Sequence, residues 1–410
     1  MTNKEKKEQG QAENWKKNKK QTELRKKEKK QAKEKKQTES RQNNKKGPEN
    51  SQKPFFEFDK RSVYKCVQCG TCRSVCPVFD LLGWESANTR GRMLIIKSLL
   101  EGLEPSKDVL PSLASCTTCG ICTAKCPAGV NPPEVVEAAR AQLVNCGIVS
   151  EGQEKLRDAV TATGNSFGET KARLHWLPAS ERSKLPEKSE YVYFVGCFDS
   201  YRYPEFAKKT FEILQRFGVT LLPDEKCCAS PLLRTGFREE AEKIMQHNLE
   251  QIRKIGADTI ITGCAGCYTT LKNNYPEELR VISLPEFLAE HLEELPLKRL
   301  PLIVSYHDPC HLGRLNNVYD APRQVITAIC TLKEMKNIKE NSRCCGGGGG
   351  VRISSPEISL ELAKKRLEDV PEGVDYLVTS CPLCVRNLRD AKGNVEVLDI
   401  IELVAMALQI

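Results

Sequence analysis

Two copies of one cysteine pattern account for ten of the twenty cysteines in this chain. Each copy contains a lone cysteine, then an adjacent Cys-Cys pair, then a CxxC motif. The pairs and the CxxC motifs are separated by 117 positions, whereas the lone cysteines are four positions out of that register. A short insertion in one surface loop explains such an offset. The pattern predicts a duplicated domain with five cysteines in each copy, Cys197, Cys227, Cys228, Cys264 and Cys267 in the first and Cys310, Cys344, Cys345, Cys381 and Cys384 in the second.

Short apolar runs lead into these cysteines. In both copies one run of strand-forming residues ends at the lone cysteine and another ends at the CxxC motif. Cysteines just beyond the ends of buried strands favour an open α/β sheet, because such sheets bind ligands at the carboxyl ends of their strands. We therefore expect two repeated α/β domains, at residues 191–295 and 296–410. The apolar residues 396–410 are too few to span a membrane and are expected to form a helix packed on the core.

A second kind of repeat precedes these domains. The motif CxxCxxCxxxCP occurs from Cys66 to Pro77 and again from Cys116 to Pro127, with every cysteine moved by fifty positions. Three closely spaced thiolates can hold three corners of a cubane, and the proline then directs the fourth cysteine to the neighbouring cluster. The spacing predicts two [4Fe-4S] cubane clusters, one held by Cys66, Cys69, Cys72 and Cys126 and the other by Cys116, Cys119, Cys122 and Cys76.

Zinc is the alternative occupant of these two motifs. Zinc needs four ligands in each site, so the number of cysteines permits two zinc sites built from CxxC knuckles. The third closely spaced cysteine and the trailing proline do not favour that arrangement. An iron-sulfur module is the preferred interpretation.

The residues around the motifs have helical patterns. Met93, Ile96 and Leu99 share one face of an expected helix at residues 89–103, and residues 134–144 are expected to form another. We therefore expect a helical ferredoxin module at residues 54–146. A polar segment with several glycines follows at residues 147–190 and is expected to be a linker.

Positive charge is concentrated at the N-terminus. Residues 1–53 hold 19 Lys and Arg against 8 Asp and Glu, so the rest of the chain is close to neutral although the formal charge of the whole is +9. A neutral body gives no reason to expect a nucleic-acid partner. Because the Lys-rich segment has almost no apolar residues to bury, we expect a disordered tail. Attraction to an anionic membrane face or to an acidic partner protein is the functional alternative.

The cysteine content indicates a cellular compartment. The sequence shows neither a secretory signal nor an apolar run long enough for a spanning helix. Twenty cysteines in such a chain predict a reducing cytoplasm, where clustered thiols bind metals or carry redox chemistry rather than form disulfides.

Five thiolates in each α/β copy exceed the four corners of a cubane. The side chains of an adjacent Cys-Cys pair diverge, so the pair suits two different irons of a larger, open cluster. Five glycines follow Cys345, and their backbone N–H groups can approach sulfide closely and tune its potential. The alternative is one cubane in each copy with a spare thiol. Cys146 and Cys330 lie outside every pattern, and we expect no metal role for them.

Further motifs resemble a known family. The cysteine-rich (CCG) repeats, with Tyr306-His-Asp-Pro-Cys-His-Leu-Gly-Arg314, Val318-Tyr-Asp-Ala-Pro-Arg323 and Asn387-Leu-Arg-Asp390, resemble the D subunit of heterodisulfide reductase. The preceding part, with Arg90-Gly-Arg-Met93 between its ferredoxin motifs, is similar to the iron-sulfur subunits of glycolate, lactate and anaerobic glycerol-3-phosphate dehydrogenases. The resemblance extends over residues 60–408 and excludes the Lys-rich tail.

The resemblance implies one or two noncubane [4Fe-4S] clusters in addition to the two cubanes. The five cysteines of each CCG copy would hold one such cluster, and the two clusters would face each other across a substrate disulfide. The first copy departs from the pattern, because Ala229 follows its Cys-Cys pair where the second copy has Gly346. If this position requires a positive φ, alanine is strained there by about 1 kcal/mol or more.

Two of the five histidines, His307 and His311, flank Cys310. Beside a site that cleaves disulfides they can donate protons to leaving thiolates. Hydrogen bonding to sulfide, or packing, is the alternative for both. The expected catalytic group consists of Cys310, Cys344, Cys345, Cys381, Cys384 and His311.

We predict an oxidoreductase subunit of anaerobic metabolism that takes electrons from a partner through the two cubanes and reduces a disulfide at the CCG clusters. The alternative is a non-catalytic electron-transfer subunit of an FAD-dependent hydroxyacid, acyl-CoA or glycerol-3-phosphate dehydrogenase. A third hypothesis is a redox-inert interaction protein stabilised by zinc. No GxGxxG motif follows a strand, so the first two hypotheses require a partner. We expect a cytochrome b-type membrane subunit or a flavoprotein, with peripheral association at the inner face of the membrane as a further expectation.

Overall fold

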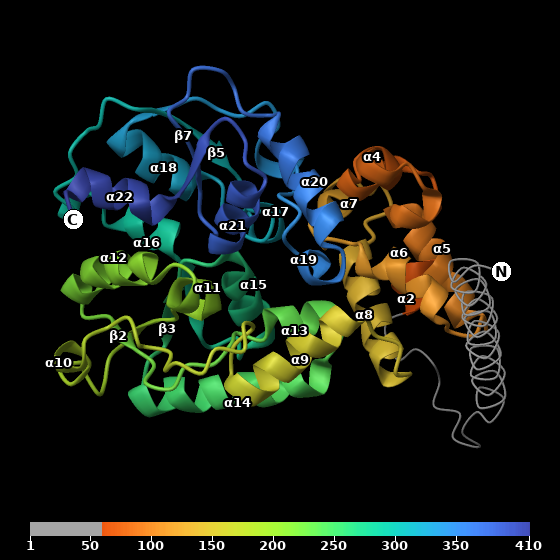
Figure 1. Cartoon of the computed structure of the whole chain (residues 1–410), viewed down its shortest axis with the longest axis horizontal. Helices are drawn as coiled ribbons and strands as arrows, with labels where there is room; N and C mark the ends of the chain where they lie inside the picture. The colour runs from red at the N-terminus through yellow and green to blue at the C-terminus, as the bar shows by residue number, and fades with distance from the viewer. Residues whose placement is uncertain (1–59) are drawn as a thin grey trace, which may run out of the picture. The chain divides into compact units, whose positions relative to one another are not determined.

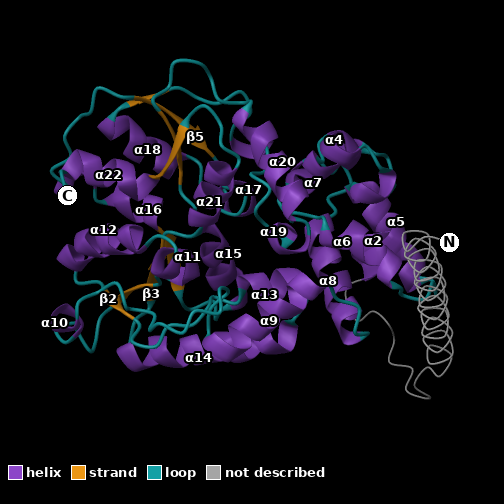
Figure 2. Ribbon diagram, in the orientation of Figure 1, coloured by secondary structure: helices purple, strands orange, loops and turns teal. Residues whose placement is uncertain are grey.

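Two parallel sheets with the same strand order form the part of the chain that follows residue 190 (Figures 1 and 2). The computed structural model describes residues 60–410, so the expected Lys-rich tail lies outside the described residues. The first sheet has the order β2-β1-β3-β4 and the second the order β6-β5-β7-β8. The predicted duplicated α/β architecture is confirmed. The strands are β1 (Tyr191–Tyr193), β2 (Thr220–Leu221), β3 (Thr259–Thr262), β4 (Arg280–Ser283), β5 (Ile303–His307), β6 (Thr331–Leu332), β7 (Tyr376–Thr379) and β8 (Glu396–Asp399).

Strand register shows where the two copies differ in length. Tyr193 and Tyr306 occupy equivalent positions in the two sheets. Their strand partners in β3 and β7 are 117 positions apart, which is also the spacing of the two Cys-Cys pairs. The segment between β6 and the Cys-Cys pair is longer than its counterpart in the first copy, and it contains a 3-10 turn at Lys339–Asn341. This turn contacts α7 (Ile121–Ala124). The offset thus arises in a loop, and that loop touches the ferredoxin motifs.

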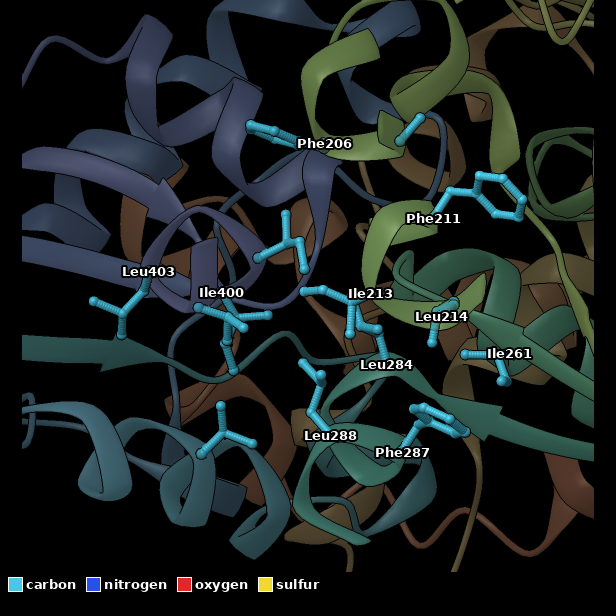
Figure 3. Close-up of a cluster of buried hydrophobic side chains, with 14 of the residues drawn as sticks. Phe206, Phe211, Ile213, Leu214, Ile261, Leu284, Phe287, Leu288, Ile400 and Leu403 are labelled. Atoms are coloured by element: carbon cyan, nitrogen blue, oxygen red, sulfur yellow. The ribbon is translucent and has the colours of Figure 1, made fainter. Parts of the chain in front are cut away.

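Helices from both copies meet in one apolar core (Figure 3). Helix α16 (Leu284–Glu290) of the first copy contacts α18 (Asp320–Ile329) of the second, and α12 (Pro204–Leu214) contacts α22 (Ile400–Leu408). The two repeats are therefore held together by apolar burial. The other helices of the repeats are α11 (Gly196–Tyr201), α13 (Ser230–Thr235), α14 (Arg238–Ile255), α15 (Ala265–Asn274), α17 (Gly313–Asn316), α19 (Val351–Ser354), α20 (Pro356–Leu367) and α21 (Pro382–Asp390).

The apolar C-terminal segment differs from the expectation of a single helix. Residues 396–399 form β8, whose backbone groups pair with β7. The helix α22 begins only after Asp399, whose side chain accepts a hydrogen bond from Ile401 N at 3.1 Å and so caps the helix. The helical prediction is correct for residues 400–408 and wrong for the four residues before them.

The segment 147–190 also differs from the expected irregular linker. It contains α9 (Glu151–Thr163), which begins with a capping box formed by Ser150 and Gln153. Leu156 and Val160 of α9 are buried in the core of the first repeat. A further helix, α10 (Ala179–Arg182), follows. A polar sequence with a narrow apolar stripe can thus fold onto a neighbouring core, and much of the expected linker does so.

The ferredoxin module is helical, as predicted. Met93, Ile96 and Leu99 of α5 pack with Val136 and Leu143 of α8 in a separate apolar core. Short helices follow the first cysteines of each motif. The helices are α2 (Lys60–Tyr64), α3 (Thr71–Ser74), α4 (Pro77–Leu82), α5 (Thr89–Leu100), α6 (Leu110–Ala114), α7 and α8 (Pro132–Asn145). Across residues 60–410, none of the helices combines the length and the apolar character that crossing a membrane requires.

The residue after each Cys-Cys pair adopts a left-handed conformation. Gly346 has φ 85° and Ala229 has φ 73°, so the first copy places an L-residue where glycine is favoured. The two positions differ in how much room they leave for a side chain. A Cβ atom added to Gly346 would overlap Ser359 O and lie 2.8 Å from Leu362 Cβ.

We expect Gly346→Ala to lower the midpoint of thermal unfolding clearly, because backbone strain of about 1–2 kcal/mol adds to the overlap with Ser359. Ala229→Gly relieves similar strain but removes a buried methyl group worth about 0.8 kcal/mol, so its midpoint should change little. Circular dichroism of the two variants measures both shifts. Equal shifts in the two variants would contradict this account.

Candidate iron-sulfur centres

The first ferredoxin group lies at the surface. Cys66, Cys69 and Cys72 line one pocket together with Cys126 from the second motif. Cys69 is exposed and the other three residues are partly buried. The structure thus brings together the cysteines that the spacing predicted, including the one exchanged between motifs.

The second ferredoxin group is more deeply buried. Cys76, Cys119 and Cys122 are each less than 7% exposed. Burial raises the pKa of the Cys122 thiol, and the nearby thiols of Cys119, Cys116 and Cys76 raise it further. These four thiols therefore share one low-dielectric site, again with one cysteine exchanged between motifs.

The five cysteines of the second CCG copy form a connected group. Cys310 follows β5 and Cys381 follows β7, the two central strands, so both lie at the carboxyl edge where the strand order reverses. Cys345 Sγ lies 3.3 Å from Cys384 Sγ. Cys344 is within hydrogen-bonding reach of both Cys310 and Cys345. Residues separated by more than seventy positions in the sequence thus meet at one edge of the sheet.

The first CCG copy has an equivalent group. The thiol of Cys197 lies close to that of Cys227, Cys227 lies close to Cys228, and Cys228 lies close to Cys267. Cys264 in turn contacts Cys267. The positive φ of Ala229 therefore does not prevent its five cysteines from gathering.

Two contacts connect neighbouring groups of cysteines. Cys119 of the second ferredoxin group is within hydrogen-bonding reach of Cys344, and both pack in one small buried cluster with Ile121. Cys264 of the first CCG copy contacts Cys381 of the second. The described chain therefore contains a continuous series of thiol groups, from the second ferredoxin group through the second CCG group to the first.

The glycine run after Cys345 allows this close approach. Gly346 N donates to Cys344 Sγ at 3.3 Å, as expected for a backbone group that tunes a sulfur ligand. A Cβ atom at Gly348 would lie 2.9 Å from Thr117 O, and one at Gly349 would overlap Cys116 O. Side chains here would push the second ferredoxin motif away from the second CCG copy.

His307 is fixed as a hydrogen-bond donor. Arg366 Nε donates to His307 Nδ1 at 2.9 Å. Because a guanidinium can only donate, neutral His307 carries its proton on Nε2, which has no partner among residues 60–410. A ring nitrogen lies within 4.8 Å of the thiols of Cys345 and Cys384. Burial, together with the charge of Arg366, lowers the pKa of His307 to about 3.

His311 has a different environment. Both of its ring nitrogens are buried without a partner among the described residues, while its backbone oxygen accepts a hydrogen bond from Thr269 Oγ1 at 2.7 Å. Burial, together with the charge of Arg234, lowers its pKa to about 3. The ring is therefore neutral in the chain alone and offers one N–H group.

Sequence reasoning missed four buried arginines. Arg173 Nη2 lies 3.6 Å from Cys197 Sγ, and Arg92 Nη1 lies 3.9 Å from Cys76 Sγ. Arg140 and Arg366 are also almost completely buried beside the cysteine groups. The Arg-Gly-Arg motif contained a signal for Arg92, but periodicity alone does not distinguish a buried arginine from a solvated one.

The residues fit anionic iron-sulfur clusters. Each group offers thiols, the ligands that such clusters use. Thiolates packed within hydrogen-bonding distance repel one another, so they require a cationic centre. Buried guanidinium groups and a backbone N–H surround the sulfur atoms, as expected where a negatively charged cluster is to be stabilised.

Comparison with known proteins agrees with this geometry. A family model described as a cysteine-rich domain (CCG) matches residues 191–272 and again residues 304–389. A 4Fe-4S dicluster domain model matches residues 62–130. The D subunit of the dihydromethanophenazine:CoB--CoM heterodisulfide reductase of Methanosarcina mazei is 36% identical over 386 residues, covering 84% of this chain and 93% of that protein.

The chain belongs to the family of heterodisulfide reductase D subunits. It is an iron-sulfur protein of an oxidoreductase family with a 4Fe-4S dicluster domain and CCG domains. The B subunit of the fumarate reductase (CoM/CoB) of Methanothermobacter marburgensis is 32% identical, covering 87% of this chain and 74% of that protein. In fold, this heterodisulfide reductase homologue resembles a hypothetical protein from Helicobacter pylori, with a TM-score of 0.52, 12% identity and coverage of 78% of this chain and 68% of that chain.

We expect Cys344→Ser to lose about four iron atoms per chain, because Cys344 joins the second CCG group to the ferredoxin group. Cys146→Ser is the matched control, since Cys146 is exposed and lies outside every group. Iron and acid-labile sulfide are assayed in anaerobically purified protein. Equal iron in the two variants would remove Cys344 from the ligand set.

Proposed function

We propose that this chain passes electrons from a partner protein through two [4Fe-4S] cubanes to noncubane clusters in its CCG domains, where a disulfide is reduced. The series of thiol groups carries the proposal, since Cys119 adjoins Cys344 and Cys264 adjoins Cys381. The second ferredoxin group thereby lies next to one CCG group, and the two CCG groups lie next to each other. This order matches a relay that ends at a paired acceptor site.

The chemistry of the acceptor site is a two-electron step. A disulfide takes two electrons and two protons, its S–S bond breaks, and two thiols form. The cysteines of the two CCG copies would hold the clusters that supply the electrons one at a time. Both sets lie at the carboxyl edges of their sheets, where open α/β sheets bind ligands.

We propose that His311 donates a hydrogen bond to the substrate at this site. Its two unpartnered ring nitrogens belong to the residue next to Cys310, so a substrate sulfur can accept the N–H that no described protein group uses. Its neighbour Thr269 also lines a cavity of about 900 Å³, together with Arg234 and Leu315. His311 is not among the residues that line this cavity, so the proposed route of a substrate to its ring passes Thr269.

The partner is proposed to meet the first ferredoxin group. Cys69 is exposed there, whereas the second ferredoxin group is enclosed by the CCG domains. A flavoprotein or a cytochrome b-type membrane subunit would supply electrons at this surface. The Lys-rich residues 1–53 would add attraction to an anionic membrane face.

The second candidate function is electron transfer without substrate chemistry. The B subunit of the fumarate reductase (CoM/CoB) of Methanothermobacter marburgensis favours this function, because the name of that enzyme gives fumarate as a substrate in addition to CoM and CoB. In that case a flavoprotein partner, for example an FAD-dependent dehydrogenase, would oxidise or reduce the substrate. The CCG clusters would then only conduct electrons.

We expect CoB--CoM heterodisulfide, the disulfide in the name of the Methanosarcina mazei relative, to reoxidise the chemically reduced full chain. The product thiols, added to oxidised protein, should give a new paramagnetic signal because a thiol sulfur then binds at a CCG cluster. Electron paramagnetic resonance and stopped-flow absorbance follow the two events.

His311→Ala should slow reoxidation by the disulfide while iron content stays unchanged. His175→Ala is the matched control, because His175 lies outside both CCG cysteine groups. A chain that ignores the disulfide and its thiols, but exchanges electrons with a co-purifying flavoprotein, would support the second candidate instead.

A further inference from the structure

Two arginines of the ferredoxin module are buried beside the second ferredoxin group. Arg92 and Arg140 are each only 1% exposed. Arg92 donates to Cys76 Sγ at 3.9 Å, to Ser112 O at 2.6 Å and to Ser115 Oγ at 3.0 Å. Its guanidinium therefore contacts a predicted cluster ligand directly.

Arg140 contacts the same group through the backbone. Its Nη2 donates to Cys116 O at 2.7 Å, and its Nε donates to Leu113 O at 3.0 Å. Its Nη1 reaches Arg234 O at 2.7 Å and Gly349 O at 2.8 Å, in the first and second CCG copies. One side chain thus joins the second ferredoxin group to both repeats.

Neither guanidinium has a carboxylate partner within 4.0 Å among the residues that the structure describes. The other two buried arginines are different, because Arg173 has Glu225 and Arg366 has Asp369. The charge of Glu137, one turn earlier on the same helix, attracts Arg140, but its carboxylate pairs directly with Arg234 at 2.5 Å. A buried charge without a counter-charge is strongly unfavourable, so Arg92 and Arg140 require a negative group nearby.

The second ferredoxin group provides that negative charge. Four thiolates around four irons leave a cluster with net negative charge, and the charge becomes more negative by one unit on reduction. A fixed positive charge in a low-dielectric site stabilises the reduced form most. Arg92 and Arg140 therefore act on the reduction potential of this centre.

The first ferredoxin group lacks this arrangement. Arg90, two residues before Arg92, is the arginine whose charge interacts with Cys69 and Cys72. Its side chain is 28% exposed, far more than those of Arg92 and Arg140, and Glu85 accepts its hydrogen bond at 2.7 Å. A charge that is paired with a carboxylate and reached by water is screened, so its effect on a nearby centre is smaller than that of an enclosed charge.

We propose that Arg92 and Arg140 keep the reduction potential of the centre in the second ferredoxin group above that of the centre in the first ferredoxin group. This difference in potential directs electrons toward the CCG domains. The inference rests on the proposed function, since it requires both centres to hold [4Fe-4S] clusters. One electron leaves the reduced centre of the first ferredoxin group and enters the oxidised centre of the second. No bond breaks and no proton moves in this step.

The test is an anaerobic redox titration of the full chain, followed by electron paramagnetic resonance. Arg92→Gln and Arg140→Gln each remove one buried positive charge. Each variant should lower the midpoint potential of the centre in the second ferredoxin group. Arg92→Lys keeps a charge and should retain most of the wild-type potential. Lys97→Gln is the matched control, because Lys97 lies on the same helix as Arg92 and pairs with Glu101 instead of a cysteine, and it should leave both potentials unchanged.

Iron and sulfide are measured in every variant, so that structural damage is separated from a shift in potential. If Arg92→Gln loses iron, Arg140→Gln carries the comparison, with Arg92→Lys as the charge-retaining variant. Fully loaded neutral variants with unchanged potentials would overturn the inference. Wild-type protein without iron would instead overturn the proposed function on which it rests.

Discussion

Eighteen cysteines gathered into four groups create a repulsion that the rest of the structure must accommodate. In the second CCG copy, hydrogen bonds with Cys345 and Cys381 raise the pKa of the Cys384 thiol, and burial raises it further. Such thiols cannot all ionise beside one another unless a cation takes up their charge. Metal binding reverses this balance, because a coordinated thiol loses its proton. The groups are therefore stable as ligand sets and costly as free thiolates.

The fold serves to bring these groups together. Parallel strands place Cys310 and Cys381 at one edge of a sheet, and the duplicated domain places Cys197 and Cys264 at an equivalent edge. The shared core of α12, α16, α18 and α22 fixes the two sheets against each other, which explains why Cys264 and Cys381 can be in contact. The glycine run after Cys345 then lets the ferredoxin motifs approach without side chains between them.

Much of this architecture could be predicted from spacing, because cysteines at fixed intervals and apolar runs of strand length are strong local signals. The strands β3 and β7 lead into the two CxxC motifs as predicted, and Ala229 has the positive φ that its glycine counterpart suggested. Sequence patterns did not reveal β8 or α9. Short strands and narrow apolar stripes depend on a neighbour for their stability, and that neighbour is distant in the chain.

The burial of these arginines could not be predicted from sequence patterns for a related reason. Arg90 and Arg92 stand two positions apart on one helix, yet Arg90 is partly exposed and paired with Glu85 while Arg92 is enclosed beside Cys76. Only the packing of α5 within the ferredoxin module separates their roles. The candidate site thus combines ligands that spacing could identify with charges that only tertiary structure could place.

The most direct test is the metal content of the full chain purified without oxygen. The account predicts iron and acid-labile sulfide in nearly equal amounts, at about eight of each per chain for the ferredoxin module and more when the CCG copies are loaded. Zinc in place of iron, or only trace iron and sulfide, would contradict it.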